Sequence, residues 1–407
     1  MASSAQTSLW DGTDAAGLRR TLAIVCAAHF ISHLHIVALP PVFALMALHY
    51  GASFAELGVA LAVFNLATLL TQPLAGVAAD RIGPRPVLAA GLVLAGLAYV
   101  AVGLSQGYGA LLALMAAAGV ANSVYHPADY AILGRVAPGA RAGRAFALHT
   151  FAGFLGGAVA PLTMAGAVMA HSWQAGVIAV GVLALVVAPL VALIPPLPGA
   201  RAAASTGRQG RVTQALSGLT GGIPVGTLLR LTGFFFLMAL ATIGLQGFAV
   251  SALTEGRGLG VAEANLALSS FLLAMALGVL AGGRLADRTR RHGALAAAAF
   301  AGAAVLMVPV ALVPLPLAVL CAVFGAAGAL VGAAMPARDM LVRAAAPEGA
   351  SGRAFGLVTS GLNAGGIVAP PLFGALIDAG QPAAIFLLAG AMMLATAALS
   401  AVGARRD

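Results

Sequence analysis

The chain has 407 residues, of which 61% are hydrophobic and only 8% are charged. An ordinary soluble domain is about half apolar and about one quarter charged, so these figures exclude a soluble enzyme and a disordered chain. All 21 basic residues are arginine, and the net charge is +9. The arginines are scattered in short clusters between apolar stretches, so they do not form the basic patch of a nucleic-acid-binding protein.

Twelve stretches of the chain are apolar and long enough to span a bilayer, which takes about 20 residues. Residues 1–19 precede the first stretch and residues 404–407 follow the last, and we expect both to be short tails. The sequence therefore predicts an all-α polytopic membrane protein with twelve transmembrane helices. The predicted spans are 20–47, 53–79, 87–105, 109–133, 144–170, 173–195, 228–252, 263–285, 293–313, 316–338, 354–378 and 382–403.

The arginines occupy alternate connections between these spans. If the helices alternate in direction, every arginine except Arg257 falls on one side of the membrane. Cytoplasmic loops of membrane proteins carry an excess of arginine and lysine, so this pattern places both termini in the cytoplasm. It also supports an even number of helices. We expect a multi-pass protein of the bacterial inner membrane, with the lipid bilayer as its surroundings.

The longest predicted connection, residues 196–227, joins the sixth and seventh spans. It is rich in Gly, Ser, Ala, Arg and Pro, a composition typical of a flexible linker. It divides the chain into residues 20–195 and residues 228–403. Each part contains six predicted spans.

These two halves repeat one another. Residues 143–146 and 352–355 are both Gly-Arg-Ala-Phe, and residues 159–161 and 368–370 are both Val-Ala-Pro. The fifth span therefore corresponds to the eleventh, and two six-helix halves of the same orientation are related by an axis along the membrane normal. Small residues and prolines in register predict close helix packing in both spans. The packing residues are Gly156, Gly157 and Pro161 in the fifth span and Gly365, Gly366 and Pro370 in the eleventh.

A short motif follows the second span and recurs half a chain later. The first copy has the pattern G-x-x-x-D-R-x-G-x-R, and the second replaces its later glycine by Arg290. Two such loops, together with twelve spans, a central linker and a repeat, resemble the major facilitator superfamily over essentially the whole chain. The resemblance implies two six-helix bundles that alternate access to a central cavity, with the motif aspartates latching one conformation. The implied gating residues are Gly76, Asp80, Arg81, Gly83 and Arg85 in the first loop and Gly283, Asp287 and Arg288 in the second.

Ionisable groups inside a bilayer are costly and are functional candidates by default. In the first span, His29 and His33 are four residues apart and share one helical face, whereas His35 points elsewhere. Histidine titrates near neutral pH, which suits proton coupling. A substrate contact or a plain interhelical hydrogen bond remains an alternative. A metal site is less supported, because no cysteine or carboxylate lies alongside.

The fourth span carries His126 and Asp129, three residues apart on one face, with Tyr125 beside them. Asp129 is the one acid placed well inside the spans of the first half. A carboxylate beside an imidazole in a low-dielectric cavity can exchange a proton as the cavity opens and closes. We therefore expect Asp129 and His126 to couple transport to protons. A purely structural ion pair is the alternative.

The His-Pro-Ala-Asp segment 126–129, with a His-Phe pair in the first span, resembles the fosmidomycin-resistance branch of the superfamily. That branch consists of proton-driven exporters. In this fold the first, fourth, seventh and tenth helices line the cavity, which gives less weight to Asn65 in the second. The resemblance implies a cavity lined by His29, His33, Tyr125, Gln246, Arg338 and Asp339.

We expect a proton-coupled secondary transporter, above all an antiporter that exports a small organic compound or drug. One alternative is a proton symporter that takes up an anionic metabolite, with Arg338 binding the anion. More remote alternatives are a lipid-translocating protein, a non-transporting membrane sensor and a His-dependent intramembrane enzyme. The sequence has no phosphate-binding Gly-x4-Gly-Lys-Ser/Thr loop and no His-Glu-x-x-His segment. We therefore expect no cofactor, no metal and no enzymatic activity, and a monomer whose partners are a small-molecule substrate and protons.

Overall fold

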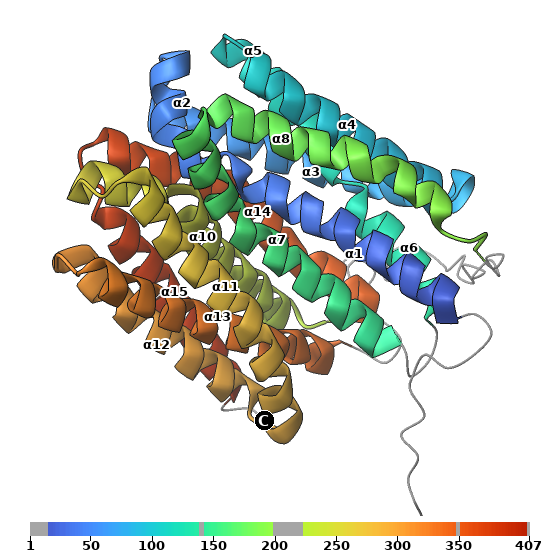
Figure 1. Cartoon of the computed structure of the whole chain (residues 1–407). Coiled ribbons are helices and arrows are strands. Elements are labelled where there is room, and N and C mark those ends of the chain that lie inside the picture. The colour runs from blue at the N-terminus through green and yellow to red at the C-terminus, as the bar shows by residue number, and fades with distance from the viewer. Residues whose placement is uncertain (1–14, 138–141, 198–222, 347–350, 405–407) are drawn as a thin grey trace, which may run out of the picture.

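The computed structural model describes residues 15–137, 142–197, 223–346 and 351–404 (Figure 1). Within these ranges the regular elements are helices. Residues 1–14 and 405–407 of the predicted tails and most of the linker 196–227 lie outside them, whereas residues 15–19 of the predicted first tail belong to α1. The α-helices are α1 (Ala15–Ala38), α2 (Phe43–Tyr50), α3 (Phe54–Ile82), α4 (Pro84–Leu104), α5 (Tyr108–Asn122), α6 (Tyr125–Val136), α7 (Ala142–Ala170), α8 (Trp173–Val187), α10 (Val225–Arg257), α11 (Val261–Arg288), α12 (His292–Leu312), α13 (Leu317–Ala345), α14 (Ser351–Asp378) and α15 (Ala384–Ala404). Two 3-10 turns, η1 (Pro40–Val42) and η3 (Ala188–Leu193), extend α1 and α8.

Twelve stretches of the described residues are long and apolar enough to cross a membrane, which confirms the predicted all-α architecture. Two of these spans contain a break. The first joins α1, η1 and α2, where Pro40 and Pro41 interrupt the helix. The fourth joins α5 and α6 and is interrupted at Ser123, four residues before Pro127. A proline lacks an N–H and its ring clashes with the carbonyl four residues earlier, so Pro127 cannot close the helical bond to Ser123.

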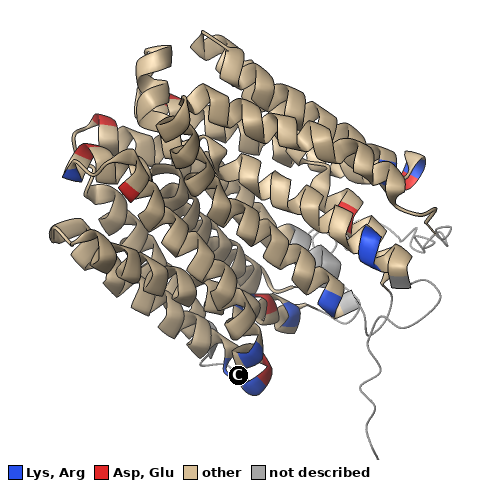
Figure 2. Ribbon diagram, in the orientation of Figure 1, with Lys and Arg blue, Asp and Glu red and all other residues tan. Residues whose placement is uncertain are grey.

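The charged residues gather at the two ends of the helical bundle and leave its long middle nearly free of charge (Figure 2). We call one end the arginine-rich end, defined by Arg19 near the start of α1, Arg81 near the end of α3, Arg230 in α10 and Arg288 at the end of α11. At the opposite end, Arg257 of α10 donates hydrogen bonds to backbone carbonyls at the end of α12 and just beyond it. The uncharged middle is the surface expected of a protein embedded in lipid.

The helix pairing of the first half recurs in the second. In the first half α1 packs on α7, α3 on α5, and α4 on α8. In the second half α10 packs on α14, α11 on α13, and α12 on α15. Each pair joins the corresponding spans of its half, so the repeat seen in the sequence is also a repeat of contacts.

Small residues bring the paired helices into backbone contact. A Cβ added to Gly156 of α7 would overlap the backbone of Phe30 in α1. A Cβ added to the equivalent Gly365 of α14 would overlap Ala239 and the backbone of Phe236 in α10. Helices in lipid associate by such close van der Waals packing, because burial of apolar surface gives little advantage there. The two glycines therefore allow the same close helix contact in the two halves.

The next glycines along the two helices, Gly157 and Gly366, have different contacts. Gly157 has ordinary contact with Val37, whereas Gly366 faces the side chain of Asn65 in the other half. Asn65 donates a hydrogen bond of 3.0 Å to the Gly366 carbonyl. Pro161 and Pro370 lie inside α7 and α14. The second copy of the repeat thus contributes to the contact between halves as well as to packing within its own half.

The two halves are joined near the end opposite the arginine-rich end. There Asp378, the last residue of α14, accepts hydrogen bonds from the backbone N–H groups of Phe54 (2.9 Å) and Ala55 (2.8 Å) at the start of α3. These N–H groups have no partner within their own helix, and the positive end of the helix dipole favours a carboxylate. A Cβ on Gly58 of α3 would overlap the backbone of Pro370, so α3 and α14 are in tight contact just below this cap. Asp378 therefore ties one half to the other.

Replacement of Asp378 by Ala should loosen this junction. A capping interaction is worth about 0.5–2 kcal/mol, so we expect amide hydrogen exchange to accelerate at both the start of α3 and the end of α14. The measurement is exchange mass spectrometry on the purified protein. Glu56→Ala is the matched control, because Glu56 caps the same helix start through Ser53 without touching the other half. Faster exchange confined to α3 in both variants would contradict an inter-half role.

Candidate functional site

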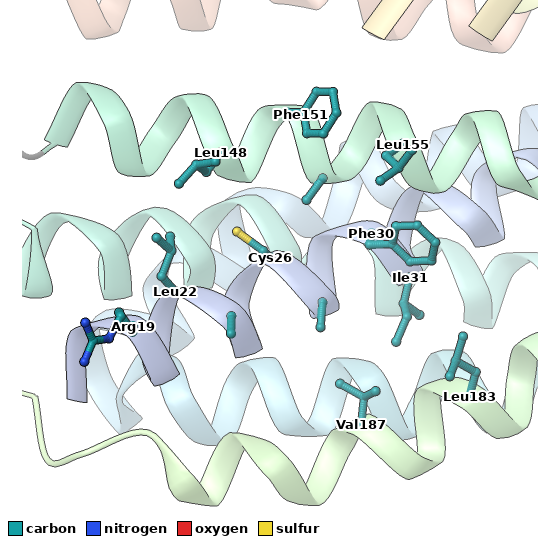
Figure 3. A pocket seen from close by; sticks show the side chains of 13 residues that line it. Arg19, Leu22, Cys26, Phe30, Ile31, Leu148, Phe151, Leu155, Leu183 and Val187 are labelled. Atoms are coloured by element: carbon teal, nitrogen blue, oxygen red, sulfur yellow. The ribbon is translucent and has the colours of Figure 1, made fainter. Parts of the chain in front are cut away.

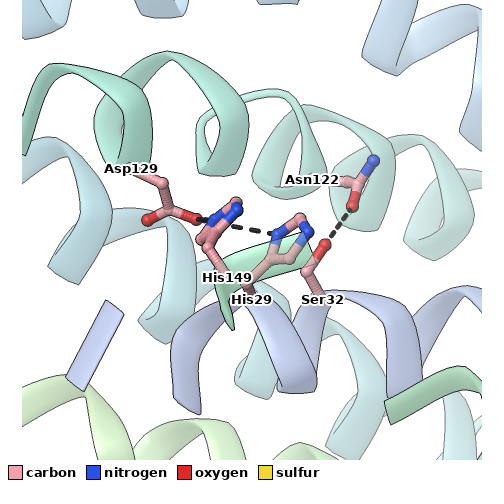
Figure 4. Close-up of polar contacts among 5 residues, drawn as sticks. All are labelled: His29, Ser32, Asn122, Asp129 and His149. Carbon is pink, nitrogen blue, oxygen red and sulfur yellow. Dashed lines mark hydrogen bonds and ion pairs between the residues drawn. The ribbon is translucent and has the colours of Figure 1, made fainter. Parts of the chain in front are cut away.

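Four histidines and one aspartate meet inside the first half, contributed by three helices. His29 and His33 come from α1, His126 and Asp129 from α6, and His149 from α7. Figure 4 shows His149 between Asp129 and His29, with Ser32 and Asn122 bonded beside them. We call the four histidines and Asp129 the histidine–aspartate cluster.

The centre of the cluster is the Asp129 carboxylate. His149 Nε2 lies 2.9 Å from Asp129 Oδ2, and His29 Nδ1 lies 3.7 Å from the same oxygen. The three side chains are 0%, 1% and 4% exposed, respectively for Asp129, His149 and His29. The other oxygen, Oδ1, has no hydrogen-bond partner among the described residues. A buried carboxylate with so little hydrogen bonding is costly when charged, so it favours either protonation or a charged imidazole beside it.

The imidazole rings form a continuous line that ends at this carboxylate. The His29 ring stacks on His149 with centroids 3.8 Å apart and planes at 19°. His126 and His33 meet the other edges of His29, at 5.1 and 4.7 Å. His126 is exposed and His33 is half-buried, whereas His29, His149 and Asp129 are buried. Ring contacts therefore connect an exposed imidazole to a fully buried acid.

Local backbone features make room for the cluster. A Cβ added to Gly153 of α7 would overlap the rings of both His29 and His33, so a larger residue there would push α7 away. The break at Ser123 starts α6 just before His126. Ser32 of α1 donates a 3.0 Å hydrogen bond to Asn122, the last residue of α5. This bond fixes α1 against the break in the fourth span.

A metal ion is the other chemistry to test against this geometry. His29, Asp129 and His149 each offer a ligand atom, and these atoms lie within 4.8 Å of one another. Two nitrogen or oxygen ligands of a tetrahedral zinc ion lie about 3.3 Å apart, because each bond is about 2.0–2.1 Å long. The 2.9 Å separation of His149 and Asp129 is shorter and matches a direct hydrogen bond. The arrangement therefore fits a shared proton better than a metal.

Tyr125 and His35 lie near the cluster but make contacts outside it. Tyr125 is 1% exposed and packs into the apolar core of the first half. Its hydroxyl has no hydrogen-bond partner among the described residues. His35 points away from the cluster, as its position in the helix predicts. It bonds the Val180 carbonyl at 3.0 Å and stacks on Tyr99.

Gln246 lines a small cavity of about 60 Å³ between the halves, together with Asn65. Its place on the seventh span favoured Gln246 as a cavity residue, and a place on the second span gave less weight to Asn65. The structure places both amide side chains at the same cavity. Asn65 is held at this cavity by its hydrogen bond to the Gly366 carbonyl across the interface between the halves.

Arg338 and Asp339 of α13 form an ion pair with one another, with Arg338 Nη2 2.8 Å from Asp339 Oδ1. The guanidinium also lies 4.9 Å from the ring centroid of Phe235 and donates to the sulfur of Met335. The side chain of Arg338 is 19% exposed and that of Asp339 is 47% exposed. The positive charge of Arg338 is therefore already compensated by its neighbours.

The two motif loops lie at the arginine-rich end. Asp80 and Asp287 are exposed, and neither forms an ion pair with another described residue. Gly83 has a φ of +95°, which favours glycine and allows the tight turn from α3 into α4. Arg85 donates a 2.9 Å hydrogen bond to the Ala192 carbonyl and so attaches this loop to the end of the sixth span. Gly76, Arg81, Gly283 and Arg288 are at or near the ends of α3 and α11.

His149 is a cluster residue that helical spacing did not predict. The spacing of His126 and Asp129 suggested that these two residues interact, but the carboxylate bonds His149 instead. A histidine in the fifth span is itself an ionisable group inside the bilayer, so that rule alone pointed to it. Its pairing with Asp129 depends on how α7 packs against α6 and α1, which no spacing within one helix reveals.

The sequence profile of the Major Facilitator Superfamily matches residues 25–253 and 231–407. The fosmidomycin resistance protein of Escherichia coli (strain K12) is 25% identical over 289 residues, which is 66% of this chain and 66% of the length of that relative. Among solved structures, the nucleoside transporter NupG superimposes with a TM-score of 0.77 at 12% identity, covering 94% of this chain and 99% of that one. A bacterial homolog of the human lysosomal transporter Spinster, in an inward-facing and occupied conformation, gives a TM-score of 0.72 at 15% identity, covering 94% of each chain. The chain is therefore a multi-pass membrane transporter, not an enzyme, and belongs to the Major Facilitator Superfamily.

Proposed function

We propose that this transporter exports a small organic compound in exchange for protons across the bacterial inner membrane, with its arginine-rich end in the cytoplasm. The histidine–aspartate cluster is the observation that carries the proposal. It combines a fully buried carboxylate, a directly bonded imidazole and a line of rings that reaches an exposed histidine. Such a group can hold a proton in one conformation and release it in another.

The proposed proton-binding groups are Asp129 and the hydrogen-bonded His149, with His29 and His126 in ring contact beside them. When Asp129 is charged, its burial is compensated only if an adjacent imidazole carries a proton. When Asp129 is protonated, the pair is neutral and tolerates a dry surrounding. A dry surrounding therefore favours the neutral form, and contact with water permits the charged form. Alternating access then moves protons together with the cycle of the halves.

The orientation and direction rest on three further observations. Arginines gather at one end of the bundle, and loops rich in arginine remain in the cytoplasm. The halves are joined at the other end by Asp378, which supports a state that opens toward the cytoplasm and receives a substrate for export. The relative with a resistance function also supports export. Each proton that enters supplies about 1.4 kcal/mol per pH unit and about 2.3 kcal/mol per 100 mV.

Proteoliposomes that contain a pH-sensitive dye test the proposal directly. Fosmidomycin and a panel of antibiotics and organic anions are added outside vesicles that have equal pH on both sides. Antiport raises the internal pH as a compound enters, whereas symport lowers it. The sign does not depend on the orientation of the protein in the vesicle. Flux of a compound without any change in internal pH would contradict proton coupling, and vesicles without protein measure passive leakage.

Uptake of an anionic metabolite by symport is the second possibility, and it assigns anion binding to Arg338. The ion pair with Asp339 and the contact with Phe235 weigh against this role, because they already compensate the guanidinium charge. Uptake would nevertheless be recognised in the same vesicles by internal acidification. Arg338→Gln would then weaken the response to anions and leave neutral compounds unaffected.

Replacement of His149 by Gln should separate hydrogen bonding from proton transfer. A Gln amide can still donate to Asp129 Oδ2, but it cannot take up a proton at neutral pH. We expect the variant to fold normally and to lose most of the pH dependence of substrate exchange. His35→Gln is the matched control, because His35 lies outside the cluster and bonds a backbone carbonyl. The measurement is the exchange rate between pH 6 and 8. If both variants followed the pH profile of the wild-type protein, the proposed role of His149 would be wrong.

A further inference from the structure

A groove of about 670 Å³ opens between α1, α7 and α8 on the first half (Figure 3). Its walls are apolar and include Leu22, Cys26 and Phe30 of α1 and Phe151 of α7. A single charged side chain lines it, Arg19, which lies at one end. Arg19 is exposed and forms no ion pair with another described residue. The groove therefore combines a long apolar channel with one positive charge at its end.

The length of the groove matches one leaflet of a bilayer. Arg19 and Ile31 both line it and are twelve residues apart on α1, which corresponds to about 18 Å along the helix. Half of the hydrocarbon core of a bilayer is about 15 Å thick. A groove with Arg19 at the depth of the lipid headgroups thus reaches the middle of the membrane at its apolar end.

Three kinds of ligand could fill an apolar groove, and the charge distinguishes them. A neutral hydrocarbon makes no use of Arg19. A compact polar solute leaves the apolar walls uncovered. An anionic phospholipid satisfies both features, since its acyl chain occupies the channel and its phosphate meets the guanidinium, which pairs with phosphate in a bidentate geometry.

We propose that this groove is a binding site for an anionic phospholipid, with one acyl chain between α1, α7 and α8 and the phosphate on Arg19. Phe30 and Leu148 line the groove, and the adjacent residues His29 and His149 belong to the histidine–aspartate cluster. The lipid fills the space between the two helices that position the stacked histidines. The binding site itself does not depend on whether the transporter moves protons.

Binding is measured on delipidated protein in detergent by native mass spectrometry, with phosphatidylglycerol and phosphatidylcholine that carry the same acyl chains. A basic side chain near a membrane surface contributes about 1 kcal/mol to the binding of anionic lipid, so we expect about a fivefold preference for phosphatidylglycerol at one site. Arg19→Gln should abolish this preference. Arg20→Gln is the matched control, because Arg20 is exposed and carries the same charge but does not line the groove.

A second variant tests the channel rather than the charge. Ala152 lines the groove, and Ala152→Phe should exclude the acyl chain and remove the bound phosphatidylglycerol. A conservative Phe151→Trp variant gives a second readout, since lipid with brominated chains should quench this tryptophan more strongly when the headgroup is anionic. Circular dichroism and elution volume show whether each variant is folded.

Three outcomes would overturn the proposal. The first is equal binding of both lipids to the wild-type protein. The second is an equal loss of preference in the Arg19 and Arg20 variants, which would indicate a diffuse effect of surface charge. The third is displacement of the lipid by a transported compound at stoichiometric amounts, which would make the groove a substrate site. None of these results bears on the coupling experiment in vesicles, so the two proposals fail independently.

Discussion

Asp129→Asn should abolish uphill transport driven by a pH gradient while leaving the protein folded. Asparagine keeps the shape of the side chain and one acceptor oxygen for His149, but it cannot take up or release a proton. We therefore expect proteoliposomes with the variant to equilibrate substrate without accumulating it. The rate of exchange should become independent of pH in the range in which the wild-type rate changes.

The second half offers a matched control for this variant. Asp339 lies in the tenth span at nearly the equivalent place, but its side chain is 47% exposed and pairs with Arg338. Asp339→Asn should therefore retain accumulation. Thermal unfolding of both variants tells loss of coupling from loss of structure. Accumulation that persists in Asp129→Asn would show that the carboxylate is structural. The stacked pair of His29 and His149 would then be the candidate proton-coupling groups.

Gly156→Ala should destabilise the first half more than the small size of the change suggests. The added methyl group would overlap the backbone of Phe30, so α7 must move away from α1. Overpacking of this kind typically costs about 1–3 kcal/mol, and it also displaces His149 from its ring contact with His29. We expect a lower unfolding temperature in detergent and a matching loss of transport.

The same helix supplies the control. Gly166 of α7 has open space where its Cβ would lie, so Gly166→Ala should leave stability unchanged or raise it slightly, because alanine has the higher helix propensity. Gly365→Ala probes the equivalent contact in the second half and should destabilise the protein by a similar amount. Equal unfolding temperatures for Gly156→Ala and Gly166→Ala would contradict the close approach of α7 and α1.

The motif aspartates Asp80 and Asp287 resemble Asp378 in their position on a helix. Asp80 and Asp287 are exposed and have no ion-pair partner among the described residues, while Asp378 holds the opposite end of the bundle together. Both Asp378 and the motif aspartates stand at the last turn of a helix. An aspartate in that position can reach the start of a helix in the other half, as Asp378 does. The bond of Asp378 to α3 is thus a structural counterpart, at the opposite end, of the latch that the family resemblance implies.

The amino-acid sequence by itself determined the number of spans, the repeat and the residue types that carry charge into the membrane. The reason is that a bilayer imposes a fixed length of apolar helix, and the ionisable residues Asp129 and His29 stand out against it. The aligned glycines Gly156 and Gly365 likewise predicted close packing, because a missing side chain can be recognised in the sequence.

Only the tertiary structure decided which of these residues meet. Helical spacing places His126 and Asp129 on one face, but it does not tell which neighbouring helix supplies the hydrogen bond, and the donor is His149. In a water-soluble helix the apolar stripe marks the inner face, whereas in lipid both faces are apolar and that guide is lost. The burial of Tyr125, the meeting of Asn65 with Gln246 and the bond between Asp378 and α3 all depend on helices far apart in the chain. Contacts of this kind arise from the packing of whole helices, so residue spacing alone could not predict them.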